Sequence, residues 1–299
     1  MRYALATAGM CVLSVCAFAQ ERPKITGVSH LAVYTTDPAK SESFYVHDLG
    51  ATKSSDPQSA QGVRYYFNPT QFVEVLPLPA GWTSVSRFDH AGYNTSDAEQ
   101  MRRYLNAHGV AVPDSVTRAS DGSSYFEVKD PEGNRVQFVQ PPAHPPTVPL
   151  NPLSHHMIHV GYIVHDIAVE DAFYHDLLGF RAYWHGGPTE DSHNWTSSQV
   201  PDGTDWLEYM KLSSPAAMTK DSAGVNDHFA LGVPNMEKAV ELLYEGDRLT
   251  AKHSDPKIGR DGKWQVNMYD PEGTRAELME FQPKVKPCCS PFLLPSPKE

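Results

Sequence analysis

Cysteine is scarce in this sequence of 299 residues, which contains four, and two of them, Cys11 and Cys16, fall within the first twenty positions. A small scaffold held together by several disulfide bonds is therefore excluded. The other two, Cys288 and Cys289, are adjacent, and neighbouring cysteines rarely bridge each other without strain. We expect this pair to cross-link two chains, to bind a soft metal or to stay free, and we assign it no catalytic role.

Basic residues are also few relative to acidic ones. The chain has 25 Lys and Arg against 36 Asp and Glu, which gives a formal net charge of −11 at pH 7. Nucleic-acid binding depends on clustered Lys and Arg side chains that neutralise phosphate charge. The composition thus excludes a nucleic-acid partner and predicts small molecules or cations as ligands.

The sequence has no apolar run near its start that is long enough to span a membrane, which takes about 20 residues. The first such run covers residues 4–15, follows Arg2 and precedes a small-residue pattern at 17–19. This order is typical of a signal peptide, here residues 1–19, and predicts a periplasmic or secreted protein. A lipid anchor on Cys16 is the alternative, but the valine before it is larger than such anchors require.

An internal duplication is the main feature that the sequence does contain. Asp-Pro-Glu-Gly occurs at residues 130–133 and again at 270–273, and each copy precedes a strand-like segment with an acid or amide at its centre. Matched segments that open the two halves contain His30 and His159. At about 100–200 residues per domain, the length also predicts two domains, each able to bury its own core.

Domain boundaries follow from these repeats and from the proline content. Residues 25–140 form the first predicted domain and residues 153–282 the second. Between them, residues 141–152 are rich in proline, which favours an extended, semi-rigid linker. A second proline-rich segment, residues 283–299, follows as a tail that we expect to pack loosely.

Each predicted domain contains the same order of elements twice, a strand, a helix and several further strands. Alternating and helical apolar patterns indicate this order, with glycine after the first and third helices. Helices are predicted near residues 37–49, 97–108, 169–178 and 236–243. The chain is thus predicted to contain four similar modules.

Three carboxylates occupy the middle of short, otherwise apolar strands. Glu74, Glu208 and Glu277 each share a strand face with apolar side chains two positions away. An unpaired buried carboxylate is costly, so such groups are normally protonated, paired with a cation or bound to a metal. Because all three recur near the ends of modules, metal binding explains them by one common cause.

Each module also opens with a histidine, at His30, His90, His159 and His228. A single strand histidine is most often a core or rim residue, but four at matched places make independent explanations less favourable. Neutral imidazole and carboxylate oxygen are common ligands of divalent Zn, Fe, Ni, Co and Mn. The pattern therefore predicts a divalent metal as cofactor.

The repeated motifs resemble those of the vicinal oxygen chelate superfamily, which includes glyoxalase I, extradiol ring-cleaving dioxygenases and bleomycin-binding proteins. DPEGNRVQF and DPEGTRAEL match its closing strand motif, and FYVHDLGA and FYHDLLGF match the motif of its first helix. The resemblance covers residues 25–282. It implies an α+β fold in which four βαβββ modules form two glyoxalase-like half-open barrel domains.

The resemblance also implies a set of metal ligands in each domain. In the second domain, which we favour as the working site, the positions are His159, Glu208, His228 and Glu277. In the first domain they are His30, Glu74, His90 and Gln137. The neutral amide at the last of these positions should weaken the hold on a divalent cation.

Relatives differ in which modules face each other, so an exchanged arrangement stays open. Exchange can occur within one chain or between two, and in the second case the protein would be a homodimer. The exchanged sets are His30, Glu74, His228 and Glu277 on one side, and His90, Gln137, His159 and Glu208 on the other.

Three functions are compatible with such a site. The favoured one is a metal-dependent lyase or isomerase that chelates two vicinal oxygens of a small substrate and stabilises an enediolate-like intermediate, with Glu277 or Glu208 as the base. The first alternative is an extradiol-type dioxygenase with an iron site of two histidines and one carboxylate, here His159, His228 and Glu277, which leaves Glu208 unexplained. The second alternative is a non-catalytic protein that binds a small molecule in an aromatic groove.

Overall fold

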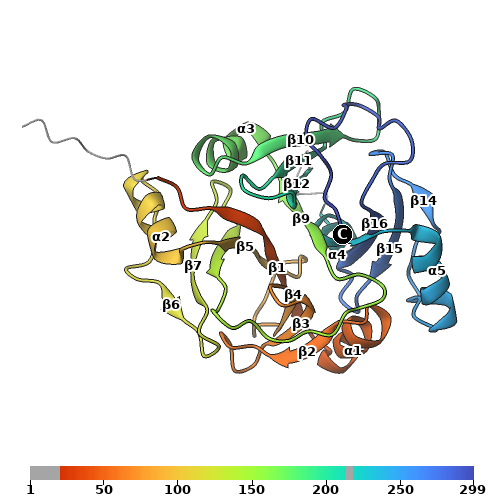
Figure 1. Ribbon diagram of the computed structural model, residues 1–299, viewed down its shortest axis with the longest axis horizontal. Helices are drawn as coiled ribbons and strands as arrows, with labels where there is room; N and C mark the ends of the chain where they lie inside the picture. Colours follow the sequence, from red (N-terminus) through yellow and green to blue (C-terminus); the bar gives the residue numbers. More distant parts are fainter. Residues whose placement is uncertain (1–20, 213–217) are drawn as a thin grey trace, which may run out of the picture.

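The computed structural model describes residues 21–212 and 218–299, which form two eight-stranded sheets, one in each half of the chain (Figure 1). The predicted signal peptide, residues 1–19, falls outside the described residues, so export to the periplasm or beyond stays a prediction. In the described part of the chain, no helix is long and apolar enough to span a membrane.

The first sheet has the strand order β2-β3-β4-β1-β5-β8-β7-β6. Its strands are β1 (Ile25–Thr35), β2 (Thr52–Ser55), β3 (Val63–Asn68), β4 (Gln71–Pro77), β5 (Phe88–Thr95), β6 (Thr117–Arg118), β7 (Ser124–Lys129) and β8 (Arg135–Gln140). Its helical segments are α1 (Pro38–Glu42), the π-helical η1 (Ser43–Asp48) and α2 (Ala98–Ala107).

The second sheet repeats this arrangement in the order β10-β11-β12-β9-β13-β16-β15-β14. Its strands are β9 (Met157–Val164), β10 (Arg181–Gly186), β11 (Trp195–Gln199), β12 (Trp206–Lys211), β13 (His228–Val233), β14 (Lys257–Ile258), β15 (Trp264–Tyr269) and β16 (Arg275–Glu280). Its helical segments are α3 (Ile167–Asp171), the π-helical η2 (Ala172–Leu177), α4 (Lys220–Asn226) and α5 (Met236–Glu245).

Neighbouring modules share one sheet in each half. Strand β1 pairs with β5, and β9 pairs with β13, both in antiparallel fashion. Within a module the first strand pairs in parallel with the last, as β1 does with β4. The exchanged arrangement therefore does not occur within the described chain, and the predicted α+β fold of two half-open barrels is confirmed (Figure 1).

Alternation along the strands separates a shared core from the two barrel interiors. Leu31 and Val33 are buried in a core to which both halves contribute, whereas His30 faces the other side of the same sheet. Phe88 and Tyr162 join the halves within this core, with ring centroids 5.2 Å apart. The barrel interiors, and with them the candidate site residues, lie away from the interface.

The first helix of each half changes from α to π geometry partway along. These helices, α1 with η1 and α3 with η2, lie where the sequence predicted them, and Gly50 and Gly179 follow them with positive φ angles of 73° and 79°. Only glycine adopts this left-handed conformation at little cost. Helix α4 was not predicted because its apolar pattern is weak, and a capping box between Thr219 and Ser222 starts it.

The repeated Asp-Pro-Glu-Gly motif joins the two halves. The phenol of Tyr45 donates to Asp270 at 3.0 Å, and the phenol of Tyr174 donates to Asp130 at 3.4 Å. Each tyrosine belongs to the π-helical segment of one half, and each aspartate to the motif of the other. The duplicated motif and the duplicated helix therefore recognise each other across the interface.

The glutamate of each motif has a matching role. Glu272 accepts a hydrogen bond from the backbone N–H of Thr36 at 2.7 Å, just before the first helix of the other half. Glu132 accepts from the N–H groups of His165 at 2.9 Å and Asp166 at 2.5 Å, at the equivalent place. The motif thus serves the assembly of the two halves.

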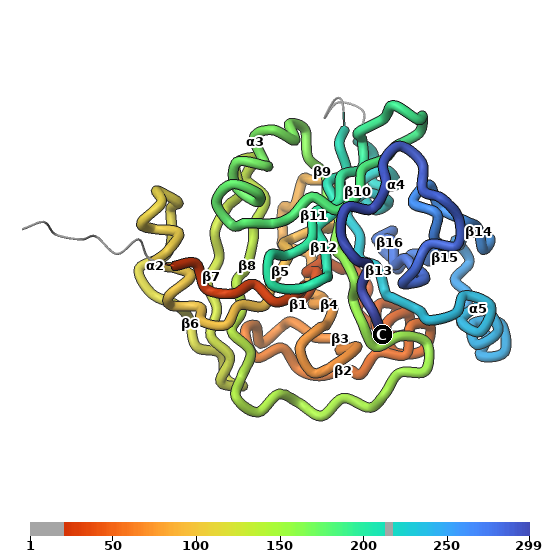
Figure 2. Tube along the Cα trace, turned by 45° about the horizontal axis from the view of Figure 1, so that its top comes forward, coloured from red at the N-terminus to blue at the C-terminus, as the bar shows by residue number. Residues whose placement is uncertain are grey.

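The proline-rich tail, residues 283–299, packs against the second half, which corrects the expectation of loose packing (Figure 2). The N–H of Leu293 donates to the carbonyl of Tyr183 on β10 at 2.9 Å. Gln199 donates to the carbonyl of Pro295 at 2.8 Å. Because β10 is the edge strand of its sheet, it has backbone groups that the tail can satisfy.

Cys288 and Cys289 form a disulfide bond with each other. The three expected states of this pair, a cross-link between chains, a soft-metal site and free thiols, did not include this bridge. Cys289 has a positive φ of 66°, and this turn is held by hydrogen bonds from the N–H of Cys288 to Arg260 at 2.8 Å and from the Trp184 indole to Cys288 at 3.2 Å. Tertiary contacts thus impose a backbone turn that the sequence does not reveal.

Candidate metal centre

Two histidines and one carboxylate meet inside the second barrel. His159 lies on β9, His228 on β13 and Glu277 on β16, three strands that are neighbours in the sheet. The Nε2 atoms of the two histidines are 3.0 Å apart, and Glu277 Oε2 lies 3.6 Å from His159 Nε2. One ligand atom from each residue lies within 4.8 Å of the others. All three residues are buried.

Both histidines are held in the neutral form that binds metals. Burial lowers the pKa of His228 well below its usual range, and Arg275 lowers it further. The Nδ1 of His228 lies 2.8 Å from the carbonyl of Asn226, so it donates there and leaves Nε2 free to bind a cation. Burial also lowers the pKa of His159, against the opposing effect of Glu208. This donor set suits a divalent metal ion.

A fourth group, Glu208 on β12, faces the same centre. Its Oε2 lies 3.3 Å from His228 Nε2 and 3.9 Å from His159 Nε2. Ser197, its cross-strand neighbour on β11, donates its hydroxyl to Glu208 Oε1 at 3.3 Å. The Glu208 side chain is 14% exposed, which makes it the most accessible member of the group.

The centre adjoins a cavity of about 490 Å³ that is lined by several aromatic side chains among polar ones. Trp184, Trp195 and Trp206 line it from the strands, and Phe292 lines it from the tail. Two of the acidic groups, Glu208 and Glu277, belong to the same lining. A flat molecule that carries oxygen atoms could therefore stack on the wall while its oxygens reach the centre.

A lysine is buried beside this aromatic wall. The ammonium of Lys263 lies 4.6 Å from the ring centroid of Trp206 and 3.3 Å from the phenol oxygen of Tyr183. Burial lowers the pKa of Lys263 to about 8, and burial raises the pKa of Glu277 to about 7. The sequence analysis missed Lys263. Comparing the two halves gives a signal for it, because the matched position in the first half is the small, uncharged Ser123.

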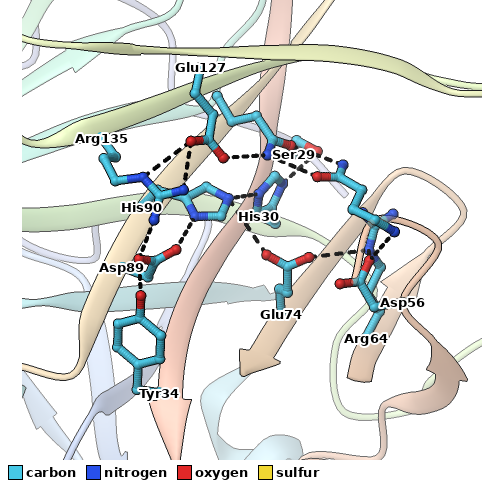
Figure 3. Close-up of polar contacts among 12 residues, drawn as sticks. Ser29, His30, Tyr34, Asp56, Arg64, Glu74, Asp89, His90, Glu127 and Arg135 are labelled. Carbon is cyan, nitrogen blue, oxygen red and sulfur yellow. Dashed lines mark hydrogen bonds and ion pairs between the residues drawn. The ribbon is translucent and has the colours of Figure 1, made fainter. Parts of the chain in front are cut away.

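The first half contains a related group, which Figure 3 shows. His30 Nε2 and His90 Nε2 are 2.9 Å apart, and Glu74 Oε2 lies 3.6 Å from His90 Nε2. A guanidinium shares this carboxylate, because Arg64 Nε lies 3.7 Å from Glu74 Oε1 and 3.0 Å from Asp56 Oδ1. The buried charge of Arg64, which is 2% exposed, is thus shared between Asp56 and Glu74.

Gln137 does not join that group. Its amide exchanges hydrogen bonds with the amide of Gln58 at 3.0 and 3.1 Å, and it donates to Glu127 at 3.3 Å. Burial alone would lower the pKa of His90, but its hydrogen bond with Asp89 raises it. The first half therefore has fewer free donors than the second.

The sequence of the first half matches a known family model. Residues 27–138 match the Glyoxalase/Bleomycin resistance protein/Dioxygenase superfamily. The first half of the chain thus carries the domain of this superfamily, and the second half resembles the first in sheet order and motifs. This superfamily is the one whose motifs the repeated segments of the sequence resemble. No curated protein sequence matches the chain.

Solved structures with a similar fold span most of the chain. The 2,3-dioxygenase LapB from Pseudomonas sp. KL28 is 14% identical with a TM-score of 0.63, over 89% of this chain and 97% of that one. A catechol 2,3-dioxygenase is 12% identical with a TM-score of 0.60, over 92% and 96%. An extradiol ring-cleaving dioxygenase from B. fuscum is 16% identical with a TM-score of 0.63, over 87% and 73%. At such identities the likeness establishes the fold.

The superfamily ligand positions divide unequally between the two barrels. The second barrel brings together His159, Glu208, His228 and Glu277, whereas the first brings together His30, Glu74 and His90 without Gln137. The sequence analysis missed Arg64. Its signal was a single arginine within the apolar strand β3, but only the strand register places it opposite Glu74. The role of each residue as a ligand or base stays a prediction.

Proposed function

We propose that this protein is an extradiol-type ring-cleaving dioxygenase, which opens the ring of a catechol beside a hydroxyl group and adds both atoms of O2 to the product. The observation that carries the proposal is the meeting of His159, His228 and Glu277 beside an aromatic cavity. Two histidines and one carboxylate form the donor set of non-haem iron oxygenases. The similar structures named as 2,3-dioxygenases or ring-cleaving dioxygenases support the proposal.

The residues present fit the ion that this chemistry requires. His159, His228 and Glu277 would hold divalent iron or manganese, which supplies a path for electrons from the catechol to O2. Trp206 would stack on the ring of the substrate and help to exclude water from the cavity. Glu208, which lies within 3.3 Å of His228 Nε2 and is partly accessible, would accept a proton from a substrate hydroxyl.

Glu208 also favours a second candidate, the metal-dependent lyase or isomerase that the sequence analysis placed first. A dioxygenase of this type needs one carboxylate, and Glu208 supplies another. With two carboxylates, the site would suit Lewis-acid chemistry on two vicinal oxygens of a small substrate. The similar structures are dioxygenases and not lyases or isomerases, so this candidate stands second.

The test is to load the protein with divalent iron under nitrogen, add catechol, admit O2 and follow oxygen uptake together with the ring-opened product. We expect one O2 to be consumed for each catechol opened. The variant His228→Ala lacks a predicted metal ligand and should lower the rate of ring opening by about 100-fold or more. The control is His90→Ala, an equally buried histidine of the first half, which should keep most of the activity and the bound iron.

The other outcomes separate the candidate functions. Loss of turnover in His90→Ala alone would move the active site to the first half. Turnover of a vicinal dioxygen compound without oxygen uptake would place the lyase or isomerase first. Binding of aromatic compounds without any metal uptake would leave the non-catalytic binding protein.

A further inference from the structure

A half-buried arginine beside the metal centre, Arg275, lacks the partners that its counterpart in the first half keeps. Arg275 opens β16 two residues before Glu277, and Arg135 opens β8 at the same place. In the first half, Arg135 Nη1 lies 2.5 Å from Asp89 and Nη2 lies 2.6 Å from Glu127 (Figure 3). Two carboxylates thus hold the charge of Arg135.

The second half has no counterpart of Glu127 in its sequence. In the strand register, Asn267 holds the place of Glu127, since Asn267 pairs with Glu277 as Glu127 pairs with Gln137. Asn267 carries no charge, and its Oδ1 is buried without a hydrogen-bond partner in the described part of the chain. A charged partner has therefore been exchanged for a neutral amide, whose Nδ2 can donate where Glu127 could only accept.

The counterpart of Asp89 is present in the second half, but it bonds to other groups. Asp227, which precedes the β13 histidine as Asp89 precedes the β5 histidine, accepts hydrogen bonds from Ile163 N–H at 3.1 Å and from the Ser86 hydroxyl at 2.5 Å. Within residues 21–212 and 218–299, the Nε of Arg275 is buried and has no partner. The ion pair of its Nη1 with the metal-site carboxylate is long, at 3.9 Å.

Arg275 and Asn267 both line the cavity of about 490 Å³ beside the metal centre. A guanidinium that is 13% exposed and weakly paired costs free energy unless an anion binds to it. The same cavity lining holds two more cations, Lys257 and Arg260, and three carboxylates, Glu208, Asp261 and Glu277. Arg260 is paired with Glu190 at 3.1 Å, whereas the Nε of Arg275 has no partner in the described part of the chain, which makes Arg275 the cation that is available to an anion.

We propose that Arg275 and Asn267 bind a carboxylate of the substrate, so that the substrate is an acidic catechol. The inference rests on the proposed function, because it names the substrate class of that same site. An arginine binds a carboxylate through two parallel hydrogen bonds, and the Asn267 amide can add another. Because Arg275 lies within 3.9 Å of Glu277, the carboxylate must sit close to the metal-binding oxygens. A carboxylate on the ring, next to a hydroxyl group, meets this condition better than one on a long side chain.

The experiment compares two probes of similar size, 2,3-dihydroxybenzoate and the uncharged 3-methylcatechol. Their binding to the iron-loaded protein is measured under nitrogen, where no turnover occurs, by the fluorescence of the cavity tryptophans Trp184, Trp195 and Trp206. We expect the acidic probe to bind at least about tenfold more tightly, as a charge-assisted hydrogen-bond pair implies.

Two variants test the source of this preference. Arg275→Met removes the charge and keeps most of the volume, and it should bring the two affinities close to each other. Asn267→Glu keeps the arginine but gives it the carboxylate that Glu127 gives Arg135, and it should abolish the preference in the same way. Arg135→Met, the control in the first half, should keep the preference of the natural chain.

The possible results separate this inference from the proposed function. Ring cleavage of both probes with no preference, or a preference that both variants keep, would overturn the inference and leave the dioxygenase in place. A preference that both variants lose, in a protein that consumes no O2 with either probe, would support the acid-binding wall and contradict the dioxygenase.

Discussion

At the scale of single residues, two glycines make room for buried histidines. Gly161 on β9 pairs with His228 in the strand register, and a Cβ at this glycine would overlap the imidazole ring. Gly92 on β5 stands in the same relation to His30 in the first half. Because the position of the ring decides where Nε2 lies, Gly161 positions a predicted ligand without touching the ion.

We expect Gly161→Ala to lower metal affinity by about 10- to 100-fold, because the added methyl group displaces the His228 ring. It should also cost about 1–3 kcal/mol of stability through overpacking. Gly92→Ala provides the matched control, since it crowds a histidine of the first barrel in the same way. Competition with a chelator measures affinity, and urea unfolding measures stability. Equal loss of metal in both variants would show that general destabilisation, and not the position of His228, is responsible.

At the scale of elements, the loops that carry Asp-Pro-Glu-Gly fasten one half to the other. Glu272, which is 3% exposed, accepts hydrogen bonds from Thr36 N–H at 2.7 Å, Arg87 Nε at 2.9 Å and Lys220 Nζ at 2.8 Å. Burial alone would raise its pKa, but bonds from Lys220, Thr36 and Arg87 lower the pKa of Glu272 to about 2. The charged carboxylate thus stabilises the interface.

We expect Glu272→Gln to lower the free energy of unfolding at pH 7 by about 2 kcal/mol, the typical value of hydrogen bonds to a charged group. Because the pKa of Glu272 is lowered in the folded state, its contribution is complete above its ordinary value and is lost as the pH falls toward about 2. The difference between variant and natural chain should therefore shrink between pH 5 and pH 3. Urea unfolding at several pH values measures it.

Glu132→Gln is the matched variant of the other motif. Glu132 accepts backbone hydrogen bonds from His165 and Asp166 but has no ion pair with Lys or Arg among the described residues, so we expect a smaller loss at pH 7. A difference in the free energy of unfolding between Glu272→Gln and the natural chain that stays constant down to pH 3 would contradict the charged role of Glu272.

At the scale of the whole molecule, two barrels of one fold differ in their electrostatics. The first places Arg64 beside Glu74 and lacks a carboxylate at Gln137, whereas the second places the neutral Ser197 beside Glu208 and has Glu277. A cation beside the carboxylate competes with a metal ion for the same charge. The molecule therefore combines one barrel suited to a metal with one that compensates its charges internally.

We expect the natural chain to bind one divalent metal ion, because only the second barrel has a carboxylate at both expected ligand positions, Glu208 and Glu277. The double variant Arg64→Ser, Gln137→Glu gives the first barrel the matching residues of the second. It should raise the number of bound metal ions to two per chain. The reciprocal Ser197→Arg should remove the ion from the second barrel. Elemental analysis after dialysis gives the metal content, and circular dichroism checks that each variant is folded. Two ions in the natural chain would contradict this assignment.

The fold was largely predictable from the sequence, because local patterns carry it. Strand alternation around Glu74 and Glu277, and glycine after the first helix of each half, depend on neighbours in the chain. The site was predictable only in part. Histidines and glutamates at repeated places indicated a metal, but the positions of Arg64 and Lys263 relative to the carboxylates follow from strand register and from packing between distant segments.

The sequence by itself determined the duplicated modules, the fold class and the places of the histidines and carboxylates, because a repeat of short motifs specifies these locally. Tertiary structure decided which modules close each barrel, that the tail lines the cavity through Phe292, and that Cys288 and Cys289 bridge each other. It also decided how the charges around the two histidine pairs differ between the barrels. That outcome depends on charges brought within a few ångströms by strand pairing, and such distances are not a property of spacing along the chain.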